Sequence, residues 1–179
     1  MKTFEFSIIA SGLDPEANDF ADRFFNAGCN DATISFQKGH IILDFARDAE
    51  SLEEAISSAV GNAVMAGATI DRIEPDPLVS LSEIAARSNL TRSAISNYVK
   101  GERGKDFPTP VARVTEDSSL YDWATVARWM FENDKIDKQL ALEAEIFKCA
   151  NEVLHNGQTH LSEPLKKRVK EYSEELEAA

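Results

Sequence analysis

The chain is poor in residues that form disulfides or bind transition metals, with two cysteines and three histidines among 179 residues. Cys29 and Cys149 stand far apart and show no metal-ligand spacing, so we interpret both as reduced thiols. His155 and His160 are five residues apart, a poor spacing for one helical face, and Asn156-Gly157 interrupts any helix between them. Neither a zinc site nor a disulfide framework is therefore expected.

Motifs of the common catalytic and membrane classes are also missing. The chain contains no G-x-S-x-G element, no P-loop and no visible Cys/His nucleophile arrangement. It lacks an apolar run of membrane-spanning length and a secretory signal pattern. These absences predict a cytoplasmic protein that is not an enzyme, needs no cofactor or metal, and does not bind a membrane.

Basic side chains are scarce, since 19 lysines and arginines face 31 acidic residues and give a net charge of −12. Such a charge by itself repels nucleic acid. The shortage is uneven, because residues 1–77 carry −9 and residues 115–179 carry −6, whereas residues 78–114 carry +3. The positive segment predicts a local affinity for phosphate. A net charge of +3 is small, so we expect two copies to act together.

Hydrophobic patterns in residues 1–74 predict a small α+β domain. Strands are expected at residues 3–9, 33–36, 41–45 and 69–73, with a hairpin turn at 37–40. One helix is expected to begin at Asp14-Pro15-Glu16, and a second follows a capping box at residues 51–54. The first helix should turn an apolar stripe inward, formed by Ala17, Phe20, Ala21, Phe24 and Phe25. The order βαββαβ is that of a ferredoxin-like domain, and Pro75-Asp76-Pro77 is expected to form a stiff linker.

The segment from Leu81 to Gly101 has the spacing of two short helices joined by a tight turn. Thr91 is placed to cap the second helix, because its hydroxyl can accept from a free backbone N–H. Asn89 stands where the turn needs a left-handed backbone, which Asn tolerates best after Gly. The residues left on the outer face of the second helix are short polar or basic ones: Arg92, Ser93, Ser96, Asn97 and Lys100.

A basic loop, an extended segment and a further helix follow these two helices. The loop is Gly101-Glu102-Arg103-Gly104-Lys105, and the extended segment at 107–114 should pair with residues 120–121 to form a two-stranded wing. The next helix begins near Trp123 and continues as V-x-x-W at 126–129. With the F-P-x-P element at 107–110, this order resembles the winged helix-turn-helix DNA-binding domains of the excisionase, AlpA and mercury-resistance-regulator (MerR) class, over about residues 78–133.

The resemblance implies that the helix from Thr91 to Lys100 enters the major groove of DNA. Arg92 and Asn97 are the best candidates for base contacts, because Arg suits the guanine edge and Asn the adenine edge. The expected contacts to the DNA backbone come from Ser93, Ser96, Lys100, Arg103 and Lys105, and Arg113 is a further candidate from the wing. The alternative is an ordinary helical hairpin with a solvated polar face.

Apolar residues of the wing and of the following helix are expected in the core of this domain. Four of them should fold back over the first two helices: Phe107, Val111, Val114 and Tyr121. Trp123 and Trp129 are interpreted as core residues rather than base-stacking ones, because of their large apolar area.

The remaining residues predict C-terminal helices at about 134–155 and from 162 onward. These helices can either pair across a dimer or fold back on their own domain. The expected organisation is therefore a domain at 1–74, a linker at 75–77, a DNA-binding domain at 78–133 and C-terminal helices at 134–179.

These patterns predict a prokaryotic or phage-type transcriptional regulator that binds double-stranded DNA as a homodimer, with autoregulating repression favoured. The N-terminal domain would assemble copies, dock a protein partner through its acidic surface, or sense a small molecule. Two other functions remain open. One is an antitoxin-like or partner-docking protein with an autoregulatory DNA-binding domain, and the other is an excisionase-like architectural factor that bends DNA for a recombinase.

Overall fold

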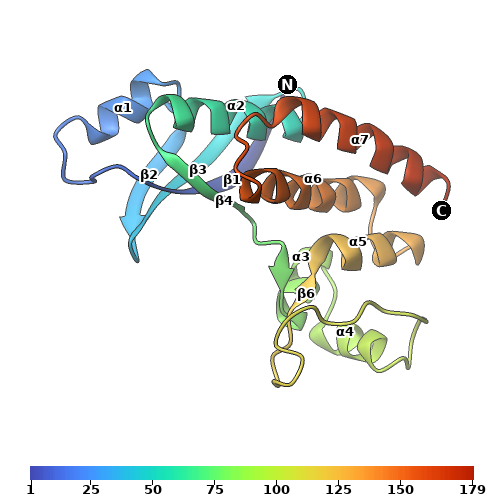
Figure 1. Cartoon of the computed structure of the whole chain (residues 1–179). Helices are drawn as coiled ribbons and strands as arrows, with labels where there is room; N and C mark the ends of the chain where they lie inside the picture. The colour runs from blue at the N-terminus through green and yellow to red at the C-terminus, as the bar shows by residue number, and fades with distance from the viewer. The chain divides into compact units, whose positions relative to one another are not determined.

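A computed structural model describes residues 1–179 as a mixed α+β chain with seven helices, a four-stranded sheet and a two-stranded sheet (Figure 1). The chain divides into two compact units. We call residues 1–75 with 146–170 the sheet unit, and residues 76–145 with 171–179 the aromatic unit. None of the helices is both long and apolar enough to cross a membrane.

The sheet unit is built from four antiparallel strands in the order β2-β3-β1-β4. Its N-terminal elements are β1 (Lys2–Ser11), α1 (Phe20–Asn26), β2 (Ala32–Gln37), β3 (His40–Ala49), α2 (Leu52–Met65) and β4 (Thr69–Glu74). The four strands, the hairpin turn and the second helix are confirmed, and each strand is longer than predicted. The strands extend beyond the residues of alternating hydrophobicity because polar residues at their ends can still form backbone hydrogen bonds.

One face of the sheet carries the core of this unit. β1 and β3 place Phe6 opposite Phe45, with the rings stacked at 5.4 Å, and Ile8 opposite Leu43. All four side chains are buried, and α2 packs against this side of the sheet. Ser51 begins α2 by accepting the Glu54 N–H at 3.4 Å. The alternation along β1 therefore separates a helix-covered face from a polar one.

The core face also contains one charged side chain, Arg47, which is only 7% exposed. Its Nε and one Nη2 hydrogen donate to the two carboxylate oxygens of Asp31, each at 2.8 Å. The remaining donors reach the Gly28 carbonyl at 2.9 Å, Ser58 Oγ at 3.1 Å and Asn62 Oδ1 at 2.8 Å. A buried guanidinium is tolerated when its five N–H groups all have acceptors, as here.

The first helix begins later than predicted, at Phe20 rather than near Asp14. The Asp14 carboxylate accepts the Glu16 N–H at 2.9 Å, which closes a turn on the proline instead of capping a helix. The predicted apolar stripe is therefore wrong in part: Phe24 is buried, whereas Phe25 is 66% exposed. A helix of seven residues has room to bury only a narrow face.

The aromatic unit contains the two helices predicted at 81–101, with a small sheet beside them. Its elements are β5 (Leu78–Val79), α3 (Leu81–Ser88), α4 (Arg92–Val99), β6 (Tyr121–Asp122) and α5 (Trp123–Glu132). The last two helices, α6 (Lys138–His155) and α7 (Ser162–Glu177), each contribute residues to both units. Trp123 and Trp129 are both buried, as predicted.

Candidate nucleic-acid interface

The second helix of the predicted pair, α4, presents two opposite faces. Ile95 and Tyr98 are buried in the core of the aromatic unit. The predicted outer residues share the opposite stripe: Arg92, Ser93 and Lys100 are exposed, and Ser96 and Asn97 are half-buried. Because these five positions recur at helical spacing, they form one continuous polar strip along α4.

Side chains and a left-handed residue fix where both helices begin and end. Thr91 Oγ1 accepts the Ala94 N–H at 3.1 Å, so the predicted cap of α4 is confirmed. Asn89 has φ 55° and ψ 37°, so the predicted left-handed turn residue is confirmed as well. The Leu90 N–H donates to the Ala85 carbonyl at 3.0 Å, which closes the end of α3. The turn between α3 and α4 is therefore only residues 89–91.

The predicted start of α3 at Leu81 is confirmed, but sequence reasoning missed the capping box that precedes it. Ser80 Oγ accepts the Glu83 N–H at 3.3 Å, and the Glu83 carboxylate accepts the Ser80 N–H at 2.7 Å. This reciprocal capping box was visible in the sequence as S-x-x-E at 80–83, directly before the apolar positions of the helix. It fixes α3, against which α4 packs.

The basic loop after α4 is held against the end of that helix. The Glu102 N–H donates to the Asn97 carbonyl at 3.0 Å, and the Gly101 N–H donates to the Tyr98 carbonyl at 3.1 Å. Gly101 has φ 72°, as this type of helix ending requires. Arg103, exposed on the loop, is thus brought beside the polar strip of α4.

A second anchor ties the loop to the core. Trp129 Nε1 donates to the Lys105 carbonyl at 2.8 Å. Gly104 lies on the same ring, because a Cβ at this residue would stand 2.8 Å from Trp129 Cζ2. The backbone of the loop is therefore fixed while the side chains of Arg103 and Lys105 extend into solvent.

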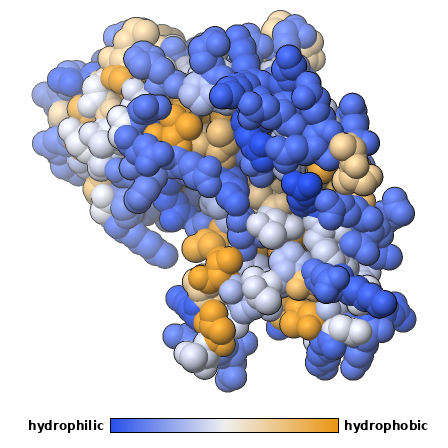
Figure 2. Space-filling model, turned by 45° about the vertical axis from the view of Figure 1, so that its right-hand side comes forward, coloured by the Kyte–Doolittle hydropathy of each residue, from blue (hydrophilic) through white to orange (hydrophobic).

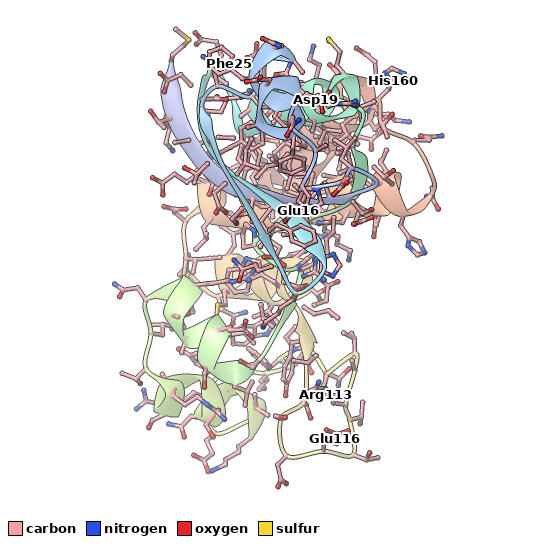
Figure 3. The ribbon with its side chains drawn as sticks, turned by 90° about the vertical axis from the view of Figure 1, so that its left-hand side faces the viewer. Glu16, Asp19, Phe25, Arg113, Glu116 and His160 are labelled. Atoms are coloured by element: carbon pink, nitrogen blue, oxygen red, sulfur yellow. The ribbon has the colours of Figure 1, made fainter.

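The predicted two-stranded wing is reduced to a single bridge. Ala112 and Leu120 exchange backbone hydrogen bonds at 2.9 and 3.3 Å, and β6 pairs with β5 instead of with the extended segment. Pro108 and Pro110 cannot donate to a ladder, and Arg113 at φ 51° ends the extended backbone directly after the bridge. Arg113 and Glu116 lie on the loop that follows (Figure 3).

The predicted inward positions of the wing are half correct. Tyr121 is buried, and Phe107 packs on Trp129 with ring centroids 5.0 Å apart. Val111 and Val114 are wrong, being 58% and 65% exposed, because the single bridge is too short to fold them over the helices. On the face of the molecule drawn in Figure 2, hydrophobic residues occur as small groups among hydrophilic ones.

The basic residues of this region share one electrostatic property. Five of them are exposed and form no ion pair: Arg92, Lys100, Arg103, Lys105 and Arg113. Elsewhere in the chain Arg23, Arg47 and Arg128 each hold a carboxylate at 2.8 to 2.9 Å. The net-positive segment therefore keeps these five cationic side chains available to an external anion, whereas its sixth basic residue, Arg87, is half-buried with its guanidinium 5.7 Å from the centroid of the Trp123 ring.

Other residues considered from the sequence do not form a second site. No group of three or more His, Cys, Asp or Glu side chains is placed to hold a metal ion, and neither cysteine forms a disulfide. The pKa of the Cys29 thiol is raised to about 11, chiefly by burial; Arg47 opposes the rise, and Asp31 makes the smallest contribution to it. That thiol is neutral at physiological pH and is not an activated nucleophile.

Comparison of the chain with protein-family models, with curated proteins and with solved structures finds no match.

Proposed function

We propose that this chain is a sequence-specific double-stranded DNA-binding transcriptional regulator, most simply an autoregulating repressor. The observation that carries the proposal is a set of five exposed basic side chains that form no ion pair: Arg92 and Lys100 on the polar strip of α4, Arg103 and Lys105 on the loop after it, and Arg113 on the next loop. A phosphate backbone is the polyanion that such a set fits, because each contact would release a condensed counterion.

The arrangement of elements supports a winged helix-turn-helix. α3 and α4 are joined by three residues, α4 exposes a polar strip, and a hairpin loop with Arg113 follows. In this geometry α4 enters the major groove, with Arg92 and Asn97 facing base edges. The contacts to the DNA backbone come from Ser93, Ser96, Lys100, Arg103 and Lys105, and Thr91 holds the N-terminus of α4 in place.

The strand order of the sheet unit supports the other half of the proposal. The strands are antiparallel in the order β2-β3-β1-β4, with helices after β1 and β3, and this order supports the proposal of a ferredoxin-like domain. In the proposed regulator this unit brings two copies of the DNA-binding unit together. Two copies double the number of phosphate contacts, which offsets the small charge of each positive segment.

Fluorescence anisotropy against duplexes tiled across the chain's own upstream region tests the proposal, beside scrambled DNA at about 0.15 M salt. We expect tight binding to one tile. Arg92→Ala and Asn97→Ala should each weaken that binding by about 1–3 kcal/mol. Asn97→Ala should leave binding to scrambled DNA nearly unchanged, whereas Arg92→Ala also removes a positive charge and should weaken binding to scrambled DNA, but by less than binding to the tile. Equal weak binding to every tile, or none, would contradict sequence-specific recognition.

Lys105→Ala supplies the complementary measurement. It should weaken binding to all sequences alike and lower the salt slope by about one unit, because it removes a phosphate contact. Lys166→Ala is the matched control, since Lys166 is an exposed lysine on α7 far from the positive segment in sequence. A loss confined to one sequence would instead place Lys105 among the base-reading residues.

One observation favours a second function, a partner-docking or antitoxin-like role. A shallow hollow lined by residues of β1, β3 and the end of β4 includes three carboxylates, Glu5, Asp44 and Glu74. A basic protein partner fits such a hollow better than DNA does. Capture of DNA by the aromatic unit together with a neighbouring basic protein by the sheet unit would favour this function over simple repression.

A further inference from the structure

The two edges of the four-stranded sheet are treated differently. At the β4 edge, Asn151 of α6 accepts the Ile73 N–H at 2.8 Å and donates to the Ile73 carbonyl at 3.0 Å. That strand also carries charges at Asp71 and Arg72. Charged residues and a covering group are devices by which proteins block the addition of another strand. The β4 edge is therefore closed.

The β2 edge has neither device. Its sequence, ATISFQ, contains no charged residue and no proline, and β3 is the only strand that pairs with it. A two-residue turn, Lys38-Gly39 at φ 52° and 82°, joins it to β3 with Gln37 opposite His40. In such a hairpin the pair next to the turn exchanges hydrogen bonds, so alternation sends the peptide groups of Ile34 and Phe36 to the free side.

The side chains at this edge are incompletely covered as well. Phe36 lies opposite Ile41 on the helix-covered face, yet Phe36 is 49% exposed while Ile41 is 1% exposed. The difference arises because Ile41 has strands on both sides and Phe36 has one. A further strand beside β2 would cover the Phe36 ring and extend the core face.

We propose that β2 is the dimer edge of this protein, pairing antiparallel with β2 of a second copy to form one continuous eight-stranded sheet. A two-fold axis at Ser35 sets Ile34 of each copy opposite Phe36 of the other, so the outward peptide groups bond to each other and the two apolar side chains meet. The inference deepens the proposed function and rests on it for the expectation that the DNA reader acts as a pair.

The occupant is a second copy because the edge is complementary to itself. The strand ATISFQ carries no charge, so two copies can pair along it without like charges facing each other, and Ile34 of each copy meets Phe36 of the other. Elsewhere residues 1–77 are strongly acidic, at −9, so two copies would repel each other over most other surfaces.

Sedimentation equilibrium of the full chain tests the pairing. The wild type should be a dimer, and Phe36→Lys and Phe36→Pro should each raise the dimer dissociation constant at least about tenfold. The positive charge introduced by Phe36→Lys reduces the electrostatic repulsion between two acidic copies, so a weaker dimer in this variant must result from disruption of the β2 edge. Met65→Lys is the matched control, because it places the same charge at a 74% exposed apolar position on α2. A monomeric wild type at high micromolar concentration, or dimeric Phe36 variants, would overturn the inference.

Amide hydrogen exchange identifies the surface without a substitution. The Ile34 and Phe36 amides should exchange more slowly as protein concentration rises, whereas Thr33 and Ser35 amides, already bonded to β3, should not change. A dimer in which Ile34 and Phe36 exchange at a constant rate would refute this edge. The DNA-binding measurements test the proposed function separately. If the protein dimerises through β2 but binds no DNA, the proposed dimer edge stands and the proposed function is wrong.

Discussion

The sheet unit and the aromatic unit use charge and burial in opposite ways. The sheet unit buries a guanidinium, Arg47, and occupies all of its donors with its own acceptors. The aromatic unit is built on packed rings, including Tyr98, Phe107 and Trp129, and five of its basic side chains, between residues 92 and 113, are exposed and form no ion pair. The buried charge of the sheet unit stabilises its own fold, whereas these five charges remain available to an external partner.

The largest expected effect comes from removing the central ring of the aromatic unit. Trp129 contacts Tyr98 and Phe107 and anchors the Lys105 carbonyl, so Trp129→Ala should lower the free energy of unfolding by about 3–5 kcal/mol. Fluorescence in urea reports this unit specifically, because Trp123 and Trp129 both lie in it. Trp129→Phe, which keeps a ring but loses the hydrogen bond, should cost clearly less. Equal losses would mean that the bond to the loop dominates.

The next effect tests the buried charge of the sheet unit. Arg47→Met removes five hydrogen bonds and leaves Asp31 without its partner, and should cost about 3 kcal/mol. Alkylation of Cys29 reports this unit, since the thiol is buried and its pKa is about 11 until the unit opens. Arg23→Met is the control: Arg23 holds Asp19 at the same Nε–Oδ2 distance of 2.8 Å, but both side chains are exposed. Only Arg47→Met should lower the free energy of unfolding measurably, because an exposed ion pair such as Arg23–Asp19 contributes little.

The Arg47–Asp31 pair makes the stability of the sheet unit fall as the pH is lowered. The hydrogen bond from Arg47 lowers the pKa of Asp31, so the stability it provides is full above the usual Asp range and is lost as pH falls through the lowered value. The wild type should therefore lose more stability than Arg47→Met between neutral pH and about pH 3. Identical losses in the two proteins would contradict this account of Asp31.

Local signals in the sequence predicted the elements around α4 well. The Thr91 cap, the left-handed Asn89 and the bounds of α3 and α4 depend on neighbours within a few residues, which the sequence displays directly. The alternation of hydrophobic and polar residues predicted β1 and β3 equally well, because both strands have one buried and one polar face.

Features that depend on distant partners could not be predicted in this way. The pairing of β5 with β6 joins residues more than forty positions apart, and Asn151 reaches Ile73 across 78 positions. Arg47 lies at an inward position of an apolar strand, and no residue near it in sequence indicates that Asp31 and α2 supply acceptors for its N–H groups. Val111 and Val114 were misplaced for the related reason that exposure depends on the length of a pairing formed in three dimensions.

The smallest effect compares two left-handed residues, one in each unit. Asn89 ends α3 at φ 55°, and Lys38 forms the β2–β3 turn at φ 52°. Asn tolerates this backbone because its short amide can bond locally, so Asn89→Ala should cost about 1 kcal/mol in the urea unfolding of the aromatic unit. Lys38→Ala should change the sheet unit very little, since lysine already carries the unfavourable β-carbon that alanine would bring. A comparable loss at both positions would show that the cost of Asn89→Ala does not arise from backbone conformation, and the tight turn before α4 would then need another explanation.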